Sequence, residues 1–337
     1  MADAMSTRER FAAVMAFQPV DRLPVVEWAA WWDQTLDAWC ARGLPPALRD
    51  RYALYDHLGL ECYWQDWIAP RRPTCPQPRA HGAGLIAPTM DAYTALRPHL
   101  YPPPEQALDP QRWAPWIARQ QRGDAVLWFT VLGFFWFPRT LLGVEEHFFA
   151  LVDAPELIHR INRDLCDWTL ALLAHLRRFA KPDFMTFAED LSYNHGPMLS
   201  PAMFEAFLAP YYREIIPTLQ EMGVRIFIDS DGDVSAPARW YAALGVDGML
   251  PLERQAGVDA AAIRAELPAM RFIGHFDKLT MHRGEAAMRA EFERLLPLMR
   301  RGGFIPSVDH QTPPAVTLDD YRTYLRLLHT FARAAAE

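Results

Sequence analysis

Acids and histidines follow a series of apolar runs in the second half of this sequence. Each run has the β-branched and aromatic content of a strand, and each ends in side chains that can hold a proton or a metal ion. In a barrel of parallel strands, the carboxyl ends of the strands meet on one face, where catalytic side chains gather. The pattern therefore predicts an enzyme. The runs are Phe187-Ala-Glu-Asp190, Phe227-Ile-Asp-Ser-Asp-Gly-Asp233, Leu250-Pro-Leu-Glu253, Gly274-His-Phe-Asp-Lys278 and Ser307-Val-Asp-His310.

Asp229, Asp231 and Asp233 stand at alternate positions directly after one of these runs, with Gly232 permitting a tight turn. Carboxylates at this spacing repel one another unless a cation, a proton or ligand hydrogen bonds compensate them. They are therefore candidates for metal ligands or for a pair that shares a proton. The alternative is an aspartate-rich turn that caps the next helix, and it applies most directly to Asp233.

His310 follows the last run and stands beside Asp309, which could set the tautomer of its ring. A histidine at the carboxyl end of a barrel strand is placed for acid–base work or metal ligation. Mixed carboxylate and imidazole ligands suit zinc, manganese or iron(II). We predict Asp229, Asp231, Glu253 and His310 as metal ligands, and Asp231, His310 and Glu189 as catalytic residues.

Aromatic residues are dense near the ends of the earlier predicted strands. Their rings could stack on a flat, aromatic or macrocyclic substrate, or could instead pack a lid or a dimer face. There is no Gly-rich phosphate loop, so no nucleotide cofactor is expected, and there is no G-x-S-x-G elbow. The predicted substrate-binding residues are Trp28, Trp31, Trp32, Trp64, Phe135 and Tyr193.

Eight strand candidates alternate with helical segments, which predicts an α/β protein with a single (β/α)8 TIM barrel and an N-terminal helical extension. One domain is expected over residues 1–337, and residues 70–104, rich in Pro, Gly and Thr, are expected to form a long loop insertion. The predicted strands cover residues 25–28, 60–66, 125–132, 184–187, 224–228, 247–250, 271–274 and 304–307.

The composition narrows the class of partner. The 337 residues carry a net charge of −7 without a block of lysine or arginine, which argues against nucleic acid and membrane surfaces as partners. No apolar run approaches the roughly 20 residues that span a bilayer. Four cysteines without a C-x-x-C pair, and an N-terminus without an apolar signal core, lead us to expect a cytoplasmic protein with reduced thiols.

The sequence resembles the uroporphyrinogen decarboxylase family, which includes the haem-pathway decarboxylase and corrinoid-linked methyltransferases. The resemblance implies one (β/α)8 barrel with its site at the carboxyl ends of the strands, and a homodimer. It runs through nearly the whole chain and rests on Arg8-Glu-Arg10, Asp21-Arg-Leu-Pro24, Leu142-Gly-Val-Glu-Glu146, Glu189-Asp190, Gly196-Pro-Met-Leu-Ser-Pro201, Pro210-Tyr-Tyr212, Gly245-Val-Asp-Gly248, Leu252-Glu253, Asp277-Lys278 and Asp309-His-Gln-Thr-Pro-Pro314.

The decarboxylase holds the carboxylates of its tetrapyrrole with an arginine pair after the first strand. The matching loop here, Glu27-Trp-Ala-Ala-Trp-Trp-Asp-Gln34, has no arginine. Asp66 looks like the decarboxylase aspartate that faces the pyrrole nitrogens, and His310 is similar to its histidine, so the resemblance adds Asp66 to the catalytic candidates. Uroporphyrinogen is nevertheless disfavoured, because each missing arginine contact removes a charge-assisted bond of roughly 1.5–3 kcal/mol.

The methyltransferases bind zinc through a His-x-Cys motif and a further cysteine. The matching places here hold Asp229-Ser-Asp231 and His310. This oxygen-rich set suggests that the metal, with zinc as the candidate, polarises the oxygen of a methoxylated aromatic compound. The resemblance then implies transfer of the methyl group to the corrinoid of a separate partner protein.

Three classes of function remain open. The first is an O-demethylating, corrinoid-dependent methyltransferase; the second is a cofactor-free decarboxylase (a carboxy-lyase) acting on a tetrapyrrole or aromatic acid; the third is a non-catalytic ligand-binding barrel. The missing arginine pair weighs against the second class. The dense strand-end acids weigh against the third, because burying them without a function costs stability.

Overall fold

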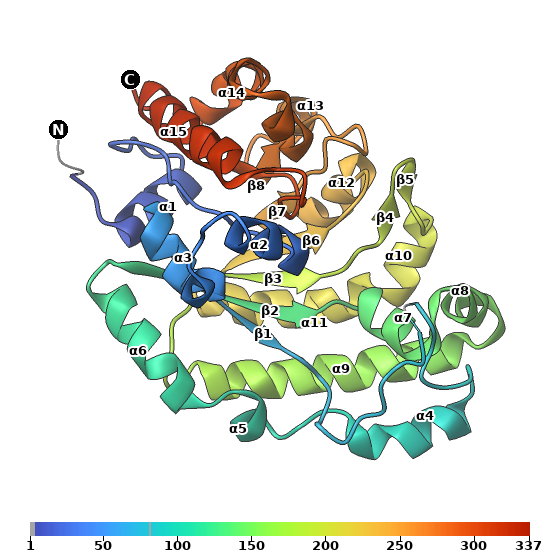
Figure 1. The fold of residues 1–337 in the computed structure, drawn as a ribbon. Coiled ribbons are helices and arrows are strands. Elements are labelled where there is room, and N and C mark those ends of the chain that lie inside the picture. The colour runs from blue at the N-terminus through green and yellow to red at the C-terminus, as the bar shows by residue number, and fades with distance from the viewer. Residues whose placement is uncertain (1–3, 81) are drawn as a thin grey trace.

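A curled sheet of seven parallel strands forms the centre of the computed structural model, which describes residues 4–80 and 82–337. The strands are neighbours in chain order, and β4 (Ser192–Tyr193) pairs with β5 (Gly196–Pro197) as a separate antiparallel ribbon. Helices lie around the outside of the sheet (Figure 1). The strands of the sheet are β1 (Cys62–Ile68), β2 (Ala125–Leu132), β3 (Phe184–Ala188), β6 (Arg225–Ser230), β7 (Gly248–Pro251), β8 (Arg271–Phe276) and β9 (Phe304–Val308).

The helices begin where the sequence provides caps. Ser6 and Glu9 form a capping box at the start of α1, and Thr317 and Asp320 form another at the start of α15. The α-helices are α1 (Thr7–Met15), α2 (Asp33–Cys40), α3 (Arg51–Leu58), α4 (Met90–Leu96), α5 (Pro104–Ala107), α6 (Pro110–Gln121), α7 (Trp136–Leu142), α8 (Val144–Asp153), α9 (Pro155–Leu176), α10 (Pro201–Phe207), α11 (Ala209–Glu221), α12 (Ser235–Leu244), α13 (Ala260–Glu266), α14 (Glu285–Met299) and α15 (Leu318–Ala334). Short 3-10 helices cover η1 (Pro46–Arg49), η2 (Arg97–His99) and η3 (Lys278–Arg283).

Seven of the eight predicted strands are confirmed, with boundaries that differ by no more than two residues. The prediction succeeds because parallel strands covered by helices are buried on both faces and read as continuous apolar runs. β2 and β3 are the clearest cases, since nearly every residue of each is buried. The α/β fold class with a TIM-barrel arrangement is therefore correct.

The predicted first strand, residues 25–28, is wrong in detail. Val25 and Val26 are buried, and the Glu61 N–H donates to the Val25 carbonyl at 2.8 Å on the β1 side. On the β9 side, the Trp28 N–H donates to the hydroxyl of Ser307 at 3.3 Å instead of to a backbone carbonyl. This segment therefore fills the seam between β1 and β9 without forming a regular strand ladder.

The long insertion, residues 70–104, packs against the outside of the barrel. Arg71 and Leu100 form an isolated bridge at its base. Its helix α4 is fixed to α9, because the Tyr93 hydroxyl and the Arg97 guanidinium both donate to Asp164 at 2.8 Å. These contacts fix the position of the insertion on the outer helix layer.

The amino-terminal end of the barrel carries a buried network of paired charges. Arg10 is 1% exposed and donates to Asp21 and Glu61 at 2.7 Å. Arg22 donates to the same Glu61 oxygen at 2.7 Å. The Arg8-Glu-Arg10 and Asp21-Arg-Leu-Pro24 motifs therefore join α1 and the seam segment to the start of β1.

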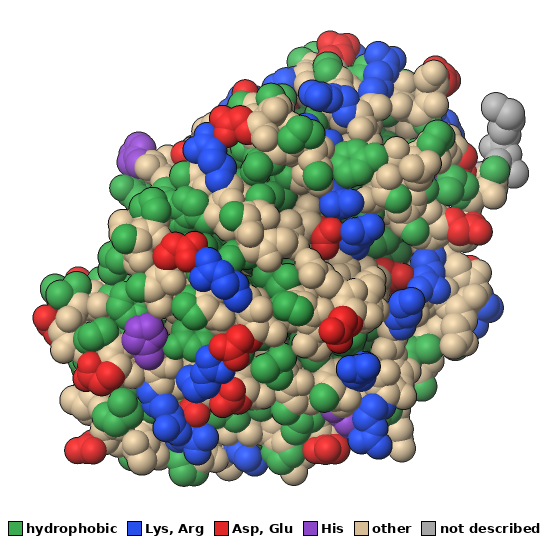
Figure 2. Space-filling model, turned by 180° about the vertical axis from the view of Figure 1, so that it is seen from behind, with side chains coloured by type: hydrophobic (Ala, Val, Ile, Leu, Met, Phe, Trp, Pro, Cys, Tyr) green, Lys and Arg blue, Asp and Glu red, His purple; other side chains and the backbone are tan. Residues whose placement is uncertain are grey.

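On the surface, acidic and basic side chains are interspersed across the face shown in Figure 2. Among residues 4–80 and 82–337, no helix combines the length and the apolar character needed to cross a membrane.

Candidate functional site

A pocket of about 330 Å³ opens at the carboxyl ends of the strands. This volume is at the lower end of the range of roughly 300–1,000 Å³ for small-molecule sites. Aromatic rings, one arginine and several acids line it, and they come from β1, β3, β6, α3, α7 and the loops after the seam segment and β9. The lining residues are Trp28, Ala29, Ala30, Arg51, Gln65, Trp67, Trp136, Ala188, Asp190, Asp229, Asp231, His310 and Gln311.

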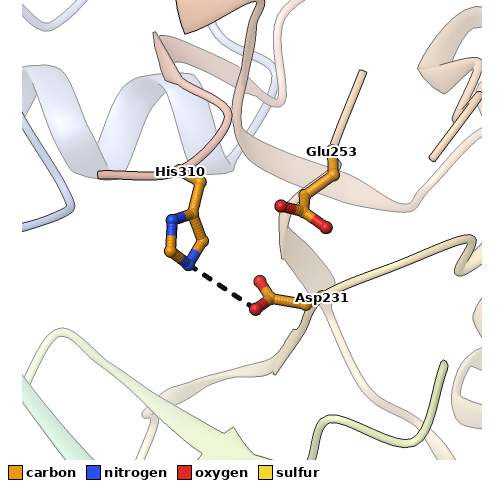
Figure 3. Close-up of side chains that lie close together, drawn as sticks. All are labelled: Asp231, Glu253 and His310. Carbon is orange, nitrogen blue, oxygen red and sulfur yellow. Dashed lines mark ion pairs between the residues drawn. The ribbon is translucent and has the colours of Figure 1, made fainter. Parts of the chain in front are cut away.

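Asp231, Glu253 and His310 converge at the edge of this pocket (Figure 3). One ligand atom from each lies within 4.8 Å of the others, and His310 Nε2 is 3.5 Å from Asp231 Oδ2. Gly232 makes the turn after β6 possible, because its φ is +81° and a Cβ there would lie 2.7 Å from the backbone of Tyr193. The N–H of Gly232 donates to Glu253 Oε2 at 3.0 Å, which links the turn to the loop after β7.

Acidic side chains crowd the pocket wall beside this cluster. The Asp231 N–H donates to Asp190 Oδ1 at 3.1 Å. Burial, and then the charge of Asp231, raise the pKa of Asp190 to about 6. Burial and the charges of Asp190 and Asp231 raise the pKa of Asp229, and burial and Asp231 raise that of Glu253. The hydrogen bond to Asp231 raises the pKa of His310, although burial opposes it. The site therefore favours bound protons or a bound cation.

The donor set of Asp231, Glu253 and His310 fits a metal ion of the zinc type. One imidazole and two carboxylates that open to a pocket can hold a divalent metal ion, because imidazole suits zinc and iron and carboxylates suit manganese and magnesium. The side chains of His310 and Asp231 are 28% and 42% exposed, so an ion can reach them. Asp229, the fourth predicted ligand, lies in the pocket wall outside this three-residue cluster.

Asp309 does not orient the ring of His310, contrary to the sequence-based expectation. Its carboxylate is fully buried and accepts the N–H groups of Arg254 and Lys278 at 2.9 and 3.2 Å. The Lys278 ammonium is 3.3 Å from the same carboxylate and 4.0 Å from that of Glu253. Asp309 therefore holds two loops together, and Asp231 is the acid that contacts His310.

Glu189 lies behind the pocket wall and not in it. It is fully buried and accepts the N–H groups of Phe134, Phe135 and Trp136 at 2.9–3.1 Å, and the hydroxyl of Tyr212. Burial raises its pKa to about 7 despite these bonds. Glu189 thus fixes the start of α7, where helix N–H groups lack partners within the helix. We therefore do not retain it as a catalytic candidate.

Asp66 also lies away from the pocket, because side chains alternate between the two faces of a strand. Asp66 accepts from Trp113 Nε1 at 2.8 Å and pairs with Arg112 at 2.9 Å, both on α6. Its neighbours Gln65 and Trp67 take the pocket face of β1. The expectation that Asp66 faces the barrel mouth is therefore wrong, because the residues on either side of it in β1 point to the pocket and Asp66 points to α6.

The predicted aromatic residues divide in the same way. Trp28 lines the pocket, held by a bond of 2.6 Å from its Nε1 to the Val308 carbonyl. Trp31 packs edge-on to Tyr55, and Trp64 stacks on Trp116 of α6. Neither of these two lines the pocket, and the same is true of the other three predicted residues. Phe135 is fully buried, whereas the side chains of Trp32 and Tyr193 lie outside the pocket with exposed fractions of 42% and 52%.

Sequence reasoning missed Arg51 and Gln65 and left Asp190 outside the predicted site. Asp190 adjoins Glu189 in the strand-end pattern, and strand phase decides between the two. Arg51 begins α3, after its N-cap Asp50, and reaches the pocket from the helix layer. No spacing to the other site residues could have indicated it.

A curled parallel sheet with an acidic and aromatic pocket at its carboxyl edge defines an enzyme-like TIM barrel. The family model "Uroporphyrinogen decarboxylase (URO-D)" matches residues 136–331, which is more than half of the 337-residue chain. The chain therefore belongs to the uroporphyrinogen decarboxylase family, a family of enzymes.

A solved methyltransferase from Methanosarcina mazei has the same fold. The two chains share 15% identity with a TM-score of 0.66, over 97% of this chain and 99% of the other. No curated protein matches the sequence significantly. An endo-β-1,4-xylanase from Gloeophyllum trabeum is 11% identical over 64% of this chain and 79% of its own, with a TM-score of 0.36, which is too low to support an argument.

Proposed function

We propose that this protein is a methyltransferase that removes the methyl group of a methoxylated aromatic compound and passes it to a corrinoid carried by a separate protein. The observation that carries the proposal is the convergence of Asp231, Glu253 and His310 at the edge of an aromatic pocket. Membership of the family and the shared fold with a methyltransferase support the same reaction class.

The size and walls of the pocket favour a substrate with one ring. A space of about 330 Å³ suits a single substituted ring better than a macrocycle of four pyrroles. Trp28, Trp67 and Trp136 line it and offer faces for aromatic stacking. The loop of residues 27–34 contributes no arginine that could hold the carboxylates of a tetrapyrrole.

The described residues can carry the proton part of this reaction. When the bond between the methyl carbon and the ether oxygen breaks, the oxygen keeps the electron pair and needs a proton or a cation. Protonated His310, stabilised by Asp231, can donate its Nε2 proton to that oxygen. If a zinc ion is held instead by Asp231, Glu253 and His310, the imidazole would be a neutral ligand without that proton, and the ion would supply Lewis-acid polarisation of the same oxygen. The Asp190 carboxylate beside Asp231 would then add negative charge that helps to retain the proton or cation, whereas the raised pKa of Asp229 favours a proton on that group.

The test is an assay of methyl transfer from methoxylated aromatics to free cob(I)alamin. The formation of methylcobalamin is monitored by its absorbance. Metal content of protein purified without chelator or metal-affinity tag is measured in parallel. We expect methylcobalamin, and near-stoichiometric metal that is lost in Asp231→Ala and His310→Ala. Methyl transfer that both variants retain would contradict the assigned roles.

Decarboxylation of an aromatic or pyrrolic acid is the second candidate. It is favoured by Asp190, an acid in the pocket with its pKa near 6, which could return a proton to the carbon that loses carbon dioxide. Release of carbon dioxide from an aromatic acid, without methylcobalamin from any methoxylated compound, would establish this reaction instead.

A further inference from the structure

Arg51 is a cation in the pocket wall whose hydrogen bonds go to neutral groups. Its Nε donates to the Tyr55 hydroxyl at 2.8 Å, Nη1 to Gln65 Oε1 at 3.0 Å and Nη2 to the Trp28 carbonyl at 2.5 Å. All three acceptors are neutral groups. Among the residues that the structure describes, no carboxylate lies within ion-pair distance of this guanidinium. Arg51 is only half-buried, so its charge is partly solvated, and the guanidinium can still accept an anion that enters the pocket.

Glu27 is the acid whose charge acts on Arg51, but its carboxyl oxygens already accept hydrogen bonds from other residues. Glu27 is 1% exposed, and its two oxygens accept from Ser307 and Tyr321 at 3.0 and 2.9 Å. Burial raises the pKa of Glu27 to about 8, although the hydrogen bonds that it accepts and the charge of Arg51 oppose this shift. The carboxyl of Glu27 is therefore bonded to Ser307 and Tyr321 and does not form an ion pair with Arg51.

Donor groups remain on the pocket side of this pair. A guanidinium has five N–H groups and a glutamine amide has two. One N–H of Arg51 Nη1 goes to Gln65, and one N–H of Gln65 Nε2 goes to Thr130 at 2.9 Å. The second N–H of each of these nitrogens has no acceptor among the described residues. Because both side chains line the pocket, these two groups can meet two oxygens of a ligand.

The cation and the acids occupy different sides of the pocket. Gln65 lies on β1, whereas Asp190 follows β3 and Asp229 lies in β6, and β2 separates β1 from β3. A ligand that spans the pocket thus meets a positive group at one end and an acidic, proton-holding group at the other. The ring-lined space between them suits a flat body.

We infer that Arg51 and Gln65 form a carboxylate-binding subsite, and that the substrate is an aromatic carboxylic acid with its methoxy group toward Asp231 and His310. The inference rests on the proposed function only for the methoxy group. The carboxylate subsite itself rests on the unpaired cation, the free N–H groups and their place in the pocket wall.

The experiment is calorimetric titration of the purified chain, without corrinoid, using 4-methoxybenzoate and 4-methoxybenzyl alcohol at neutral pH. The two ligands share the ring and ether and differ in the carboxylate. We expect the acid to bind at least about tenfold more tightly, as one charge-assisted hydrogen bond provides. Equal affinities, or no binding of the acid at millimolar concentration, would overturn the inference.

Two variants test whether Arg51 is the source of the preference for the acid over the alcohol. Arg51→Met should abolish it while keeping the affinity for the alcohol, and a melting curve shows whether the variant folds. Arg49→Met is the matched control, since Arg49 is exposed and pairs with Asp37 away from the pocket; it should retain the wild-type preference. A preference that survives in folded Arg51→Met would overturn the assignment, and the wild-type comparison still decides if that variant does not fold. Methyl transfer is not part of this measurement, so failure of the proposed function is seen separately.

Discussion

The two ends of the barrel differ in how their acidic side chains are paired with cations. At the amino-terminal end, each carboxylate of the Arg10 network has an arginine partner at 2.7 Å. At the carboxyl-terminal end, Asp190, Asp229 and Asp231 lie close together, and among the described residues their one ion pair joins Asp231 to His310 at 3.5 Å. Although burial opposes it, Arg10 lowers the pKa of Asp21, whereas burial and neighbouring acids raise the pKa values of Asp190 and Asp229.

This difference separates stability from function along the barrel axis. When charges are paired and buried, removing either partner lowers the free energy of unfolding, because the other charge is left buried alone. Acids that are crowded without partners destabilise the fold until a proton, cation or ligand arrives, and such groups cluster at functional sites. The comparison can be tested by substitutions at each end.

The largest effect is expected at the paired end. Arg10→Met should lower the free energy of unfolding by about 3–5 kcal/mol, because Glu61 and Asp21 lose a buried partner. Urea unfolding measures this change. Arg8→Met is the control, since Arg8 is 36% exposed and its single ion pair with Asp183 should be worth under about 1 kcal/mol. Equal losses in the two variants would remove the distinction between a buried network and an ordinary ion pair.

At the other end, His310→Gln should reduce methyl transfer by about 100-fold or more, the usual effect of losing a general acid. The melting temperature should change little, because the ring is partly exposed and its ion pair is with the half-exposed Asp231. His282→Gln, on the exposed surface of η3, provides the control and should keep full activity. A variant that lost both activity and stability would indicate a structural role for His310.

Relieving the crowded acids should stabilise the fold in a pH-dependent way. The pKa of Asp190 is about 6 in the folded chain against 3.8 as its ordinary value, so the folded state binds more protons between these values. Wild-type stability should therefore fall as pH rises through this window. Asp190→Asn lacks this fall and should be more stable at pH 8 by about 1–2 kcal/mol, with no gain below pH 4.

Asparagine suits this test because it tolerates the positive φ of 37° at residue 190. Urea unfolding at the two pH values gives the comparison. A gain that is the same at both would show that repulsion between the acids is not its source.

The smallest effect is expected at Asp233. Its Oδ1 accepts the Ser235 N–H at 3.0 Å, which is the turn role that the sequence offered as the alternative to ligation. Asp233→Ala should cost about 0.5–1 kcal/mol and leave methyl transfer unchanged. Loss of activity in this variant would extend the site beyond Asp231.

The sequence predicted the strands and the edge of the sheet that carries the site, but not which residue of each strand end enters the pocket. Each face of β1 carries both aromatic and polar side chains, so the sequence alone does not distinguish Trp64 and Asp66 from Gln65 and Trp67 as pocket residues. Glu189 and Asp190 are adjacent acids, and one peptide unit separates a pocket residue from a helix anchor. Tertiary contacts with α6 and α7 decide both cases, and no local pattern encodes them.

Side chains along β1 point alternately to the pocket and to the helix layer, so substitutions in this strand have two kinds of consequence. Trp64 and Asp66 are fixed by the packing of α6, whereas Gln65 and Trp67 line the pocket. Substitutions at the second pair can alter which molecule is accepted while the helix layer stays intact. One short strand thus combines residues that anchor the helix layer with residues that shape the pocket, and the second set can be changed without disturbing the first.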